Sequence, residues 1–234
     1  MKSNYGYINM RLVTLGDTST GKTSITVAAT AISDGRGGTD ESALSKYQLT
    51  EKPSTIGASF RTYETLVESH TFNSGLALST DSPQSEQTQT FYKIRLEIWD
   101  TAGQERYKCV APMYYREAKI ILMVYAIDNI ISFESLRGWM GQINSMPIRP
   151  ILFLIGNKSD MEDQRAVTRE QAEKFAKEYA MVFYETSAKS CDNIIKVFNE
   201  AARLAFENLS QLEPFNKDYI VTLNNNPSQS YCQC

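Results

Sequence analysis

The chain has 234 residues, of which 42% are hydrophobic and 22% are charged, so it can bury a real core and is not expected to be disordered as a whole. Its length fits one domain with sizeable additions. Lys and Arg number 24 against 27 Asp and Glu, for a net charge of −3, and the sequence has no dense basic run. A nucleic-acid-binding surface is therefore not expected.

The supply of histidine and cysteine argues against two kinds of site. His70 is the single histidine, and the four cysteines form no C-x-x-C pair, so neither a zinc fold nor a Ser-His-Asp triad is expected. No secretory signal is evident, which predicts reduced thiols. Apolar runs fall far short of the roughly 20 residues of a membrane-spanning helix, and the chain is not expected to cross a membrane by itself.

The first half of the chain predicts a strand, a loop, a helix and a hairpin. The strand covers residues 7–15 and the helix 24–31, with a Gly-Thr-Ser loop between them. Two more strands are expected at 59–67 and 91–99. Polar segments interrupt this half and are interpreted as loop insertions without elements of their own, near 33–45 and 68–90.

In the second half, apolar runs alternate with amphipathic stretches. Continuous apolar runs are typical of strands that are covered on both faces of a parallel sheet, and apolar residues at helical spacing predict helices. The elements expected are strands at 120–127, 151–155 and 182–184 and helices around 133–143, 169–179 and 194–205. This alternation favours a doubly wound α/β domain, and the polar segment after 207 is expected to be a linker.

Residues 16–23, GDTSTGKT, fit the phosphate-binding pattern G-x-x-x-x-G-K-[ST] between a predicted strand and a predicted helix. Glycines let backbone N–H groups wrap phosphates, Lys22 can reach the β and γ oxygens, and the Thr23 hydroxyl can hold Mg²⁺. By itself this loop predicts a nucleoside triphosphate and magnesium.

Two more motifs follow predicted strands. In WDTAGQE, Asp100 can reach the Mg²⁺ shell, Gly103 offers a bare N–H to a γ-phosphate, and Gln104 can orient a water. The alternative interpretation, in which Trp99 is a core residue and Asp100 only a cap, would not explain the Gly103-Gln104 pair that follows. In NKSD, the Asp160 carboxylate can accept hydrogen bonds from N1 and the 2-amino group of guanine, a donor pair that adenine lacks. TSAK at 186–189 can bring a backbone N–H to the base.

Taken in order, GDTSTGKT, WDTAGQERY, NKSD and ETSAKS resemble the motifs of the Ras-superfamily small GTPases, and STIGASF at 54–60 resembles the first switch of the Rab family. TIGASF together with APMYYR at 111–116 is most similar to the early-endosomal branch, whose members direct endosome tethering and fusion. The resemblance implies a P-loop NTPase fold, a small G domain over 1–209 with a six-stranded, mostly parallel sheet flanked by helices, and a flexible tail at 210–234.

The resemblance also implies residue roles. Gln104 and Lys22 are the expected catalytic residues, and Thr23, Thr55 and, through water, Asp100 are the expected Mg²⁺ ligands. GTP and GDP are the expected substrate and product. The implied nucleotide-binding set is Thr18, Ser19, Thr20, Gly21, Lys22, Thr23, Ser24, Thr55, Gly103, Asn157, Lys158, Asp160, Ser187, Ala188 and Lys189. The implied effector surface is Phe60, Trp99 and Tyr114, for which plain core packing is the alternative.

Cys232 and Cys234 resemble the Cys-x-Cys ending that carries two geranylgeranyl groups on Rab proteins. One lipid gives only reversible membrane binding and this tail has no polybasic helper, so two would be needed. The implied partners are an exchange factor, a GTPase-activating protein, a GDP dissociation inhibitor, an escort protein, a geranylgeranyl transferase and effectors. A monomer is expected at the cytoplasmic face of early endosomes or related vesicles, with a cytosolic pool.

The sequence departs from the family pattern at several positions. Thr18, Ser19 and Thr20 could crowd the γ-phosphate or an incoming catalytic group, which predicts slow intrinsic hydrolysis. No arginine of the chain itself is an obvious arginine finger, the residue that stabilises charge in the transition state, so dependence on an activating protein is expected. The aromatic residue that the family places over the guanine is out of register here, and Tyr47 is the candidate for this role. A GTP-cycling switch is the first hypothesis and a GTP-locked binding module the second. A P-loop kinase is disfavoured because NKSD selects guanine.

Overall fold

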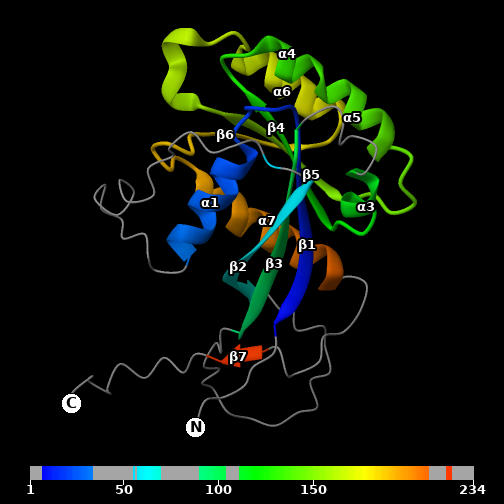
Figure 1. Ribbon diagram of the computed structural model, residues 1–234. Helices are drawn as coiled ribbons and strands as arrows, with labels where there is room; N and C mark the ends of the chain where they lie inside the picture. Colours follow the sequence, from blue (N-terminus) through cyan, green and yellow to red (C-terminus); the bar gives the residue numbers. More distant parts are fainter. Residues whose placement is uncertain are drawn as a thin grey trace, which may run out of the picture.

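A twisted seven-stranded sheet runs through the protein, with helices on both of its faces (Figure 1). The computed structural model describes residues 7–33, 55, 57–69, 90–103, 111–210 and 220–222. The strands are β1 (Ile8–Leu15), β2 (Ala58–Ser69), β3 (Thr90–Thr101), β4 (Ile120–Ala126), β5 (Ile151–Asn157), β6 (Val182–Thr186) and β7 (Ile220–Thr222). Their order is β2-β3-β1-β4-β5-β6, and β7 pairs with β3.

Every pair along this path is parallel except β2 with β3, which form an antiparallel hairpin. The helices are α1 (Lys22–Ser33), α3 (Ala111–Tyr115), α4 (Ile130–Glu134), α5 (Leu136–Ile143), α6 (Arg169–Glu178) and α7 (Ile194–Ser210), with a 3-10 helix η2 (Ser159–Gln164). The predicted α/β class and mostly parallel sheet are confirmed.

Side chains that alternate along the strands divide the core into two layers. Leu12 and its neighbours on one face of the sheet pack against α1 and α7. Val13 and its neighbours on the other face pack against α3, α5 and α6. Both faces of the central strands are therefore covered, which explains why β4 is an uninterrupted run of buried residues.

The structure differs from the sequence-based expectation at several elements. The predicted hairpin strands are longer at both ends, because β2 and β3 pair from Ala58 opposite Thr101 to Ser69 opposite Thr90. The helix expected around 133–143 consists of α4 and α5, which meet at Ser135. The final helix extends to Ser210.

A seventh strand lies in the segment for which the sequence predicts a flexible tail. Ile220 to Thr222 pair antiparallel with Tyr92 to Thr90, at the end of the sheet where β1 has not yet begun, since Ile8 lies opposite Ile94. This start of β3 would otherwise present unpaired backbone groups on that side, and the β-branched sequence IVT suits a strand. The expectation of a tail without structure is therefore wrong at these three residues.

Several predicted features lie outside the described residues: Gln104, Tyr47, His70, Cys109, Cys232, Cys234 and most of the insertions near 33–45 and 68–90. Among the described residues, no helix combines the length and apolar character that a membrane span requires.

Candidate active site

The carboxyl ends of the parallel strands meet at one edge of the sheet, which is where α/β proteins bind ligands. The loop from Gly16 to Gly21 joins the end of β1 to the start of α1 at this edge (Figure 1). Thr23 and Ser24 lie half-buried in the first turn of α1. The predicted phosphate loop therefore has a helix N-terminus behind it, where backbone N–H groups and the helix dipole favour anions.

Lys22 is the most unusual charged residue of this loop. Its side chain is 5% exposed, and Nζ donates hydrogen bonds to the carbonyl oxygens of Gly16 at 2.9 Å and Asp17 at 2.6 Å. Burial lowers the pKa of Lys22 to about 8, against opposing attraction from Asp100 and Asp17. The ammonium thus sits in a poorly solvated position where phosphate oxygens would be strong acceptors.

The three loop residues between Asp17 and Gly21 differ in solvent exposure. Thr18 and Ser19 are exposed, and Ser19 adopts a positive φ of 63°. Thr20 is buried, and its hydroxyl donates to the Asp17 carbonyl oxygen at 3.0 Å. Of the three residues predicted to crowd the γ-phosphate, Thr18 and Ser19 are therefore the ones with exposed side chains.

Gly21 is required by a close approach between the phosphate loop and the end of β5. Its φ is 90°, and a Cβ at this position would lie 2.1 Å from Nδ2 of Asn157. The same Asn157 amide donates to the Thr20 carbonyl oxygen at 2.9 Å. A side chain at Gly21 would displace this link.

Three predicted metal ligands meet below the loop. The Thr23 hydroxyl donates to Oδ2 of Asp100 at 2.6 Å and lies 2.9 Å from Oγ1 of Thr55. Among the described residues, no group of three His, Cys, Asp or Glu side chains could hold a metal. The cluster instead offers two hydroxyls and one carboxylate, which fits Mg²⁺, a cation that takes oxygen ligands and draws much of its shell from phosphates and water.

Gly103, two residues beyond β3, closes this side of the site. A Cβ on Gly103 would lie 2.5 Å from both Nζ of Lys22 and the backbone nitrogen of Thr18. The Gly103 backbone therefore lies so close to the phosphate loop that a residue with a Cβ would not fit there.

The predicted guanine residues occupy the ends of β5 and β6. Oδ1 of Asn157 accepts hydrogen bonds from the Thr186 hydroxyl and the Ala188 N–H, both at 3.3 Å. Oδ1 of Asp160 accepts from the Ser187 hydroxyl at 2.6 Å. The structure thus brings together two motifs that are about thirty positions apart in the sequence.

The two lysines of these motifs form ion pairs. Lys158 has a φ of 68°, and its Nζ lies 3.1 Å from both carboxylate oxygens of Asp128. Nζ of Lys189 lies 3.8 Å from Oδ2 of Asp160. The Lys189 pair is the weaker of the two, since its side chain is largely exposed.

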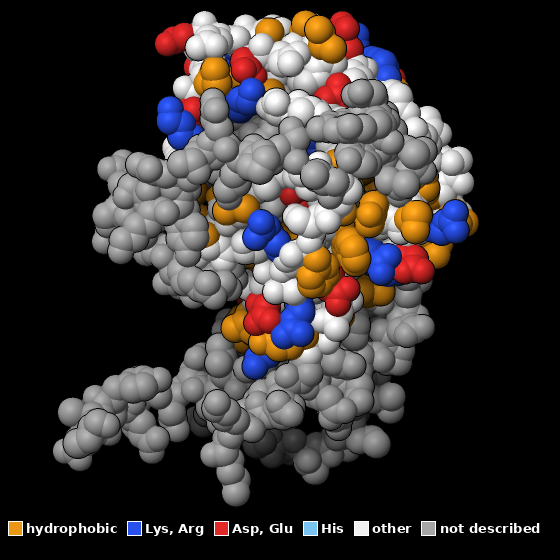
Figure 2. Space-filling model, in the orientation of Figure 1, with side chains coloured by type: hydrophobic (Ala, Val, Ile, Leu, Met, Phe, Trp, Pro, Cys, Tyr) orange, Lys and Arg blue, Asp and Glu red, His pale blue; other side chains and the backbone are white. Residues whose placement is uncertain are grey.

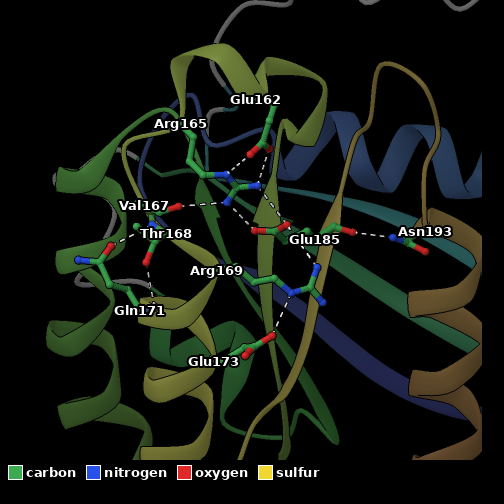
Figure 3. A network of polar contacts seen from close by, with 9 residues as sticks. All are labelled: Glu162, Arg165, Val167, Thr168, Arg169, Gln171, Glu173, Glu185 and Asn193. Atoms are coloured by element: carbon green, nitrogen blue, oxygen red, sulfur yellow. Dashed lines mark hydrogen bonds and ion pairs between the residues drawn. The ribbon is translucent and has the colours of Figure 1, made fainter.

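A network of charged residues, called the brace below, joins η2, β6 and α6 next to these loops (Figure 3). The guanidinium of Arg165, just after η2, donates to both oxygens of Glu162 and both oxygens of Glu185 in β6. The Glu185 carbonyl oxygen also accepts from the Asn193 amide at 2.9 Å. Sequence reasoning missed this brace, and no local signal could have found it, because Arg165 and Glu185 meet only through the pairing of β5 and β6.

The three predicted effector residues also meet. Trp99 contacts Phe60 with ring centroids 5.4 Å apart and Tyr114 at 5.6 Å. Phe60 is 52% exposed and the neighbouring Met113 75%, and hydrophobic side chains gather on this face of the molecule around α3 (Figure 2). The aromatic residues therefore form part of the accessible surface as well as the edge of the core.

Comparison with known proteins decides the family. A sequence model of the Ras family matches residues 65–207. Ras-related protein RABF2b of Arabidopsis thaliana is 36% identical over 198 residues, which cover 84% of this chain and 80% of the relative. The chain belongs to the Rab family of small GTPases.

Two more relatives of this Rab GTPase carry related names. Ras-related protein Rab5A of Oryza sativa subsp. japonica is 36% identical over 197 residues, 83% of this chain and 79% of the relative. GTP-binding protein ypt5 of Schizosaccharomyces pombe is 36% identical over 199 residues, 84% of this chain and 77% of the relative. This Rab GTPase therefore binds guanine nucleotides, hydrolyses GTP and belongs to a family that acts in vesicle traffic.

Proposed function

We propose that this Rab GTPase is a Mg²⁺-dependent switch that cycles between GTP and GDP and recruits effectors in endocytic transport. One observation carries the proposal: Lys22, Thr23, Thr55 and Asp100 converge where β1 and β3 end. The loop that holds Asp160 follows β5 at the same edge of the sheet.

In this proposal, hydrolysis is an in-line attack of water on the γ-phosphorus, and positioning and charge stabilisation supply the catalysis. Lys22 exchanges the carbonyl oxygens of Gly16 and Asp17 for β- and γ-phosphate oxygens. Gln104 orients the attacking water, and Thr23 and Thr55 offer oxygens to the metal. Mg²⁺ held by these residues would supply positive charge beside the phosphate oxygens.

The switch function rests on where the phosphate-sensing residues lie along the hairpin. Thr55 comes shortly before β2, and Gly103 comes shortly after β3. Between them, Phe60 and Trp99 are cross-strand partners. Contacts from a γ-phosphate to Thr55 and Gly103 would order both ends of this hairpin, and hydrolysis would release them. Effectors that bind the aromatic surface would therefore distinguish the two nucleotide states.

Endosomal membranes are the proposed location, supported by the resemblance of TIGASF and by relatives named Rab5A and ypt5. Lipids on Cys232 and Cys234 would anchor the chain, with an escort protein, a transferase and a GDP dissociation inhibitor as proposed partners. A fluorescently tagged Cys232→Ser/Cys234→Ser variant should lose membrane association, whereas either single variant should keep part of it. Equal membrane association of the double variant and the natural chain would refute the anchor.

The test of the switch is to extract the bound nucleotide from purified protein and follow its conversion. GTP should decay slowly to GDP in Mg²⁺ buffer and faster with a Rab-specific activating protein, and Gln104→Leu should slow conversion about tenfold or more. A protein that carries no guanine nucleotide and binds none would overturn the assignment.

A GTP-locked binding module is the second candidate. It is favoured by Thr18 and Ser19, because their side chains are exposed on the phosphate loop and would crowd a catalytic group that approaches the γ-phosphate. GTP that persists after long incubation, with and without the activating protein, would support this candidate. Restored turnover in a Thr18→Gly/Ser19→Gly variant would identify the loop as the cause.

A further inference from the structure

The buried carboxylate of Asp100 accepts hydrogen bonds from the hydroxyl groups of two residues that are not in the predicted nucleotide-binding set. Thr14 Oγ1 donates to Oδ1 of Asp100 at 3.1 Å, and Ser59 Oγ donates to Oδ2 at 3.3 Å. Thr14 and Asp100 are both 0% exposed. Together with Thr23, which also donates to Oδ2, these residues surround one carboxylate with three hydroxyl donors.

Strand register explains why the two hydroxyls reach Asp100. Thr14 is its partner in the parallel pairing of β1 with β3, and Ser59 is its partner in the antiparallel pairing of β2 with β3. Side chains of directly paired residues lie on the same face of a sheet. The backbone of Thr14 is itself held, since the Thr101 hydroxyl donates to its carbonyl oxygen at 2.6 Å.

The two oxygens of Asp100 have different surroundings. Oδ1 faces the Thr14 hydroxyl on the neighbouring strand, whereas Oδ2 faces Thr23, whose hydroxyl lies 2.9 Å from Oγ1 of Thr55. An ionised carboxylate accepts hydrogen bonds and donates none. The Thr14 donor on Oδ1 therefore restrains rotation of the carboxylate and favours the orientation in which Oδ2 is directed at Thr23 and Thr55.

We propose that Thr14 and Ser59 are positioning residues that orient Asp100 toward bound Mg²⁺ and thereby set the Mg²⁺ dependence of nucleotide retention. This inference rests on the proposed Mg²⁺-dependent function. Loss of a group that orients a metal-binding side chain typically costs about 10- to 100-fold in metal affinity. Thr14 carries the larger part, because its bond is shorter and fully buried, while Ser59 is half-buried on the edge strand.

The experiment measures the release rate of a fluorescent GDP from the full chain as free Mg²⁺ is titrated, and compares Mg²⁺ midpoints. Thr14→Val removes the hydroxyl and keeps the shape, and we expect its midpoint to rise about tenfold or more. Thr14→Ser keeps a donor and should restore the natural midpoint. Thr30→Val is the matched control, because the Thr30 hydroxyl donates to the carbonyl oxygens of Thr26 and Val27 within α1.

Release in excess EDTA separates positioning from general damage. Thr14→Val should release GDP at the natural rate without Mg²⁺, whereas a merely structural role would accelerate release at every Mg²⁺ concentration. A natural Mg²⁺ midpoint in Thr14→Val would overturn the inference. If Thr14→Val does not fold, Ser59→Ala decides: its Mg²⁺ midpoint should rise, by less than the roughly tenfold expected for the buried partner, and an unchanged midpoint would refute the inference. A GDP release rate from the natural chain that does not change with Mg²⁺ concentration would instead refute the proposed metal dependence itself.

Discussion

The side-chain amide of Asn157 donates a hydrogen bond of 2.9 Å to the carbonyl oxygen of Thr20, across 137 positions of sequence. The carbonyl oxygen of the same side chain accepts from Thr186 and Ala188. Asn157 therefore joins the predicted phosphate loop to the loops that carry the predicted guanine-binding residues, and both parts of the proposed site depend on one amide.

Asn157→Ala should weaken both halves of the site. It leaves the buried Thr20 carbonyl and Ala188 N–H without this partner, which costs about 1–3 kcal/mol of unfolding free energy, and GDP release should accelerate about tenfold or more. Urea unfolding and fluorescent GDP release measure these effects. Asn144→Ala, at an exposed position after α5, is the control and should change neither; equal behaviour of the two variants would contradict the bridging role.

Gly103→Ala should impair the site, because the new Cβ would lie 2.4 Å from the Asp17 carbonyl carbon and 2.5 Å from the Thr18 nitrogen, which are backbone atoms. Nucleotide affinity and hydrolysis should both fall. Gly138→Ala is the matched control, since nothing lies within 4 Å of its Cβ in α5, and alanine there should stabilise the helix by up to about 1 kcal/mol. Normal GTP turnover by Gly103→Ala would contradict the close approach.

The free energy of unfolding of the nucleotide-free protein should increase as the pH rises above about 8, because Lys22 loses its proton more readily in the folded state. The folded-state pKa of Lys22, about 8, lies below the ordinary value of 10.5, so the unfolded chain binds more protons in this window and the free energy of unfolding increases with pH. The difference corresponds to about 3 kcal/mol.

The comparison with Lys22→Met isolates this effect from other groups, including Tyr63, whose pKa burial raises to about 12. The variant without nucleotide should be the more stable protein at pH 7, and its advantage should shrink toward pH 10. A stability difference that is independent of pH between 7 and 10 would show that Lys22 is not desolvated.

The pair of Arg165 with Glu185 should matter for both stability and nucleotide retention. The two side chains are 17% and 12% exposed, and Glu185→Ala leaves Glu162 as the carboxylate that still pairs with the Arg165 guanidinium, so the variant should cost about 2 kcal/mol. GDP release should accelerate because the Asp160 and Ser187 loops lose their brace. Glu173→Ala, in the exposed pair with Arg169, should cost less than about 0.5 kcal/mol; thermal melts of the two variants compare them directly.

Local sequence determined the phosphate loop and the order of elements. Gly16 to Thr23 are contiguous, and their spacing predicts the loop because backbone conformation and side-chain reach are decided within a few residues. Apolar runs likewise predict β4 and β5, since burial on both faces of a sheet leaves no place for polar residues. The predicted ligands Thr23, Thr55 and Asp100 do meet, but their distances come from the fold.

Tertiary structure alone decided which other groups serve the site. Thr14 and Ser59 reach Asp100 only because β1 and β2 pair with β3 in one register, and a shift of one residue would turn them to the opposite face of the sheet. The Arg165 to Glu185 pair and the placement of β7 depend on strand pairing in the same way. Register is a property of whole strands packed against a core, so it cannot be found in any short segment of the chain.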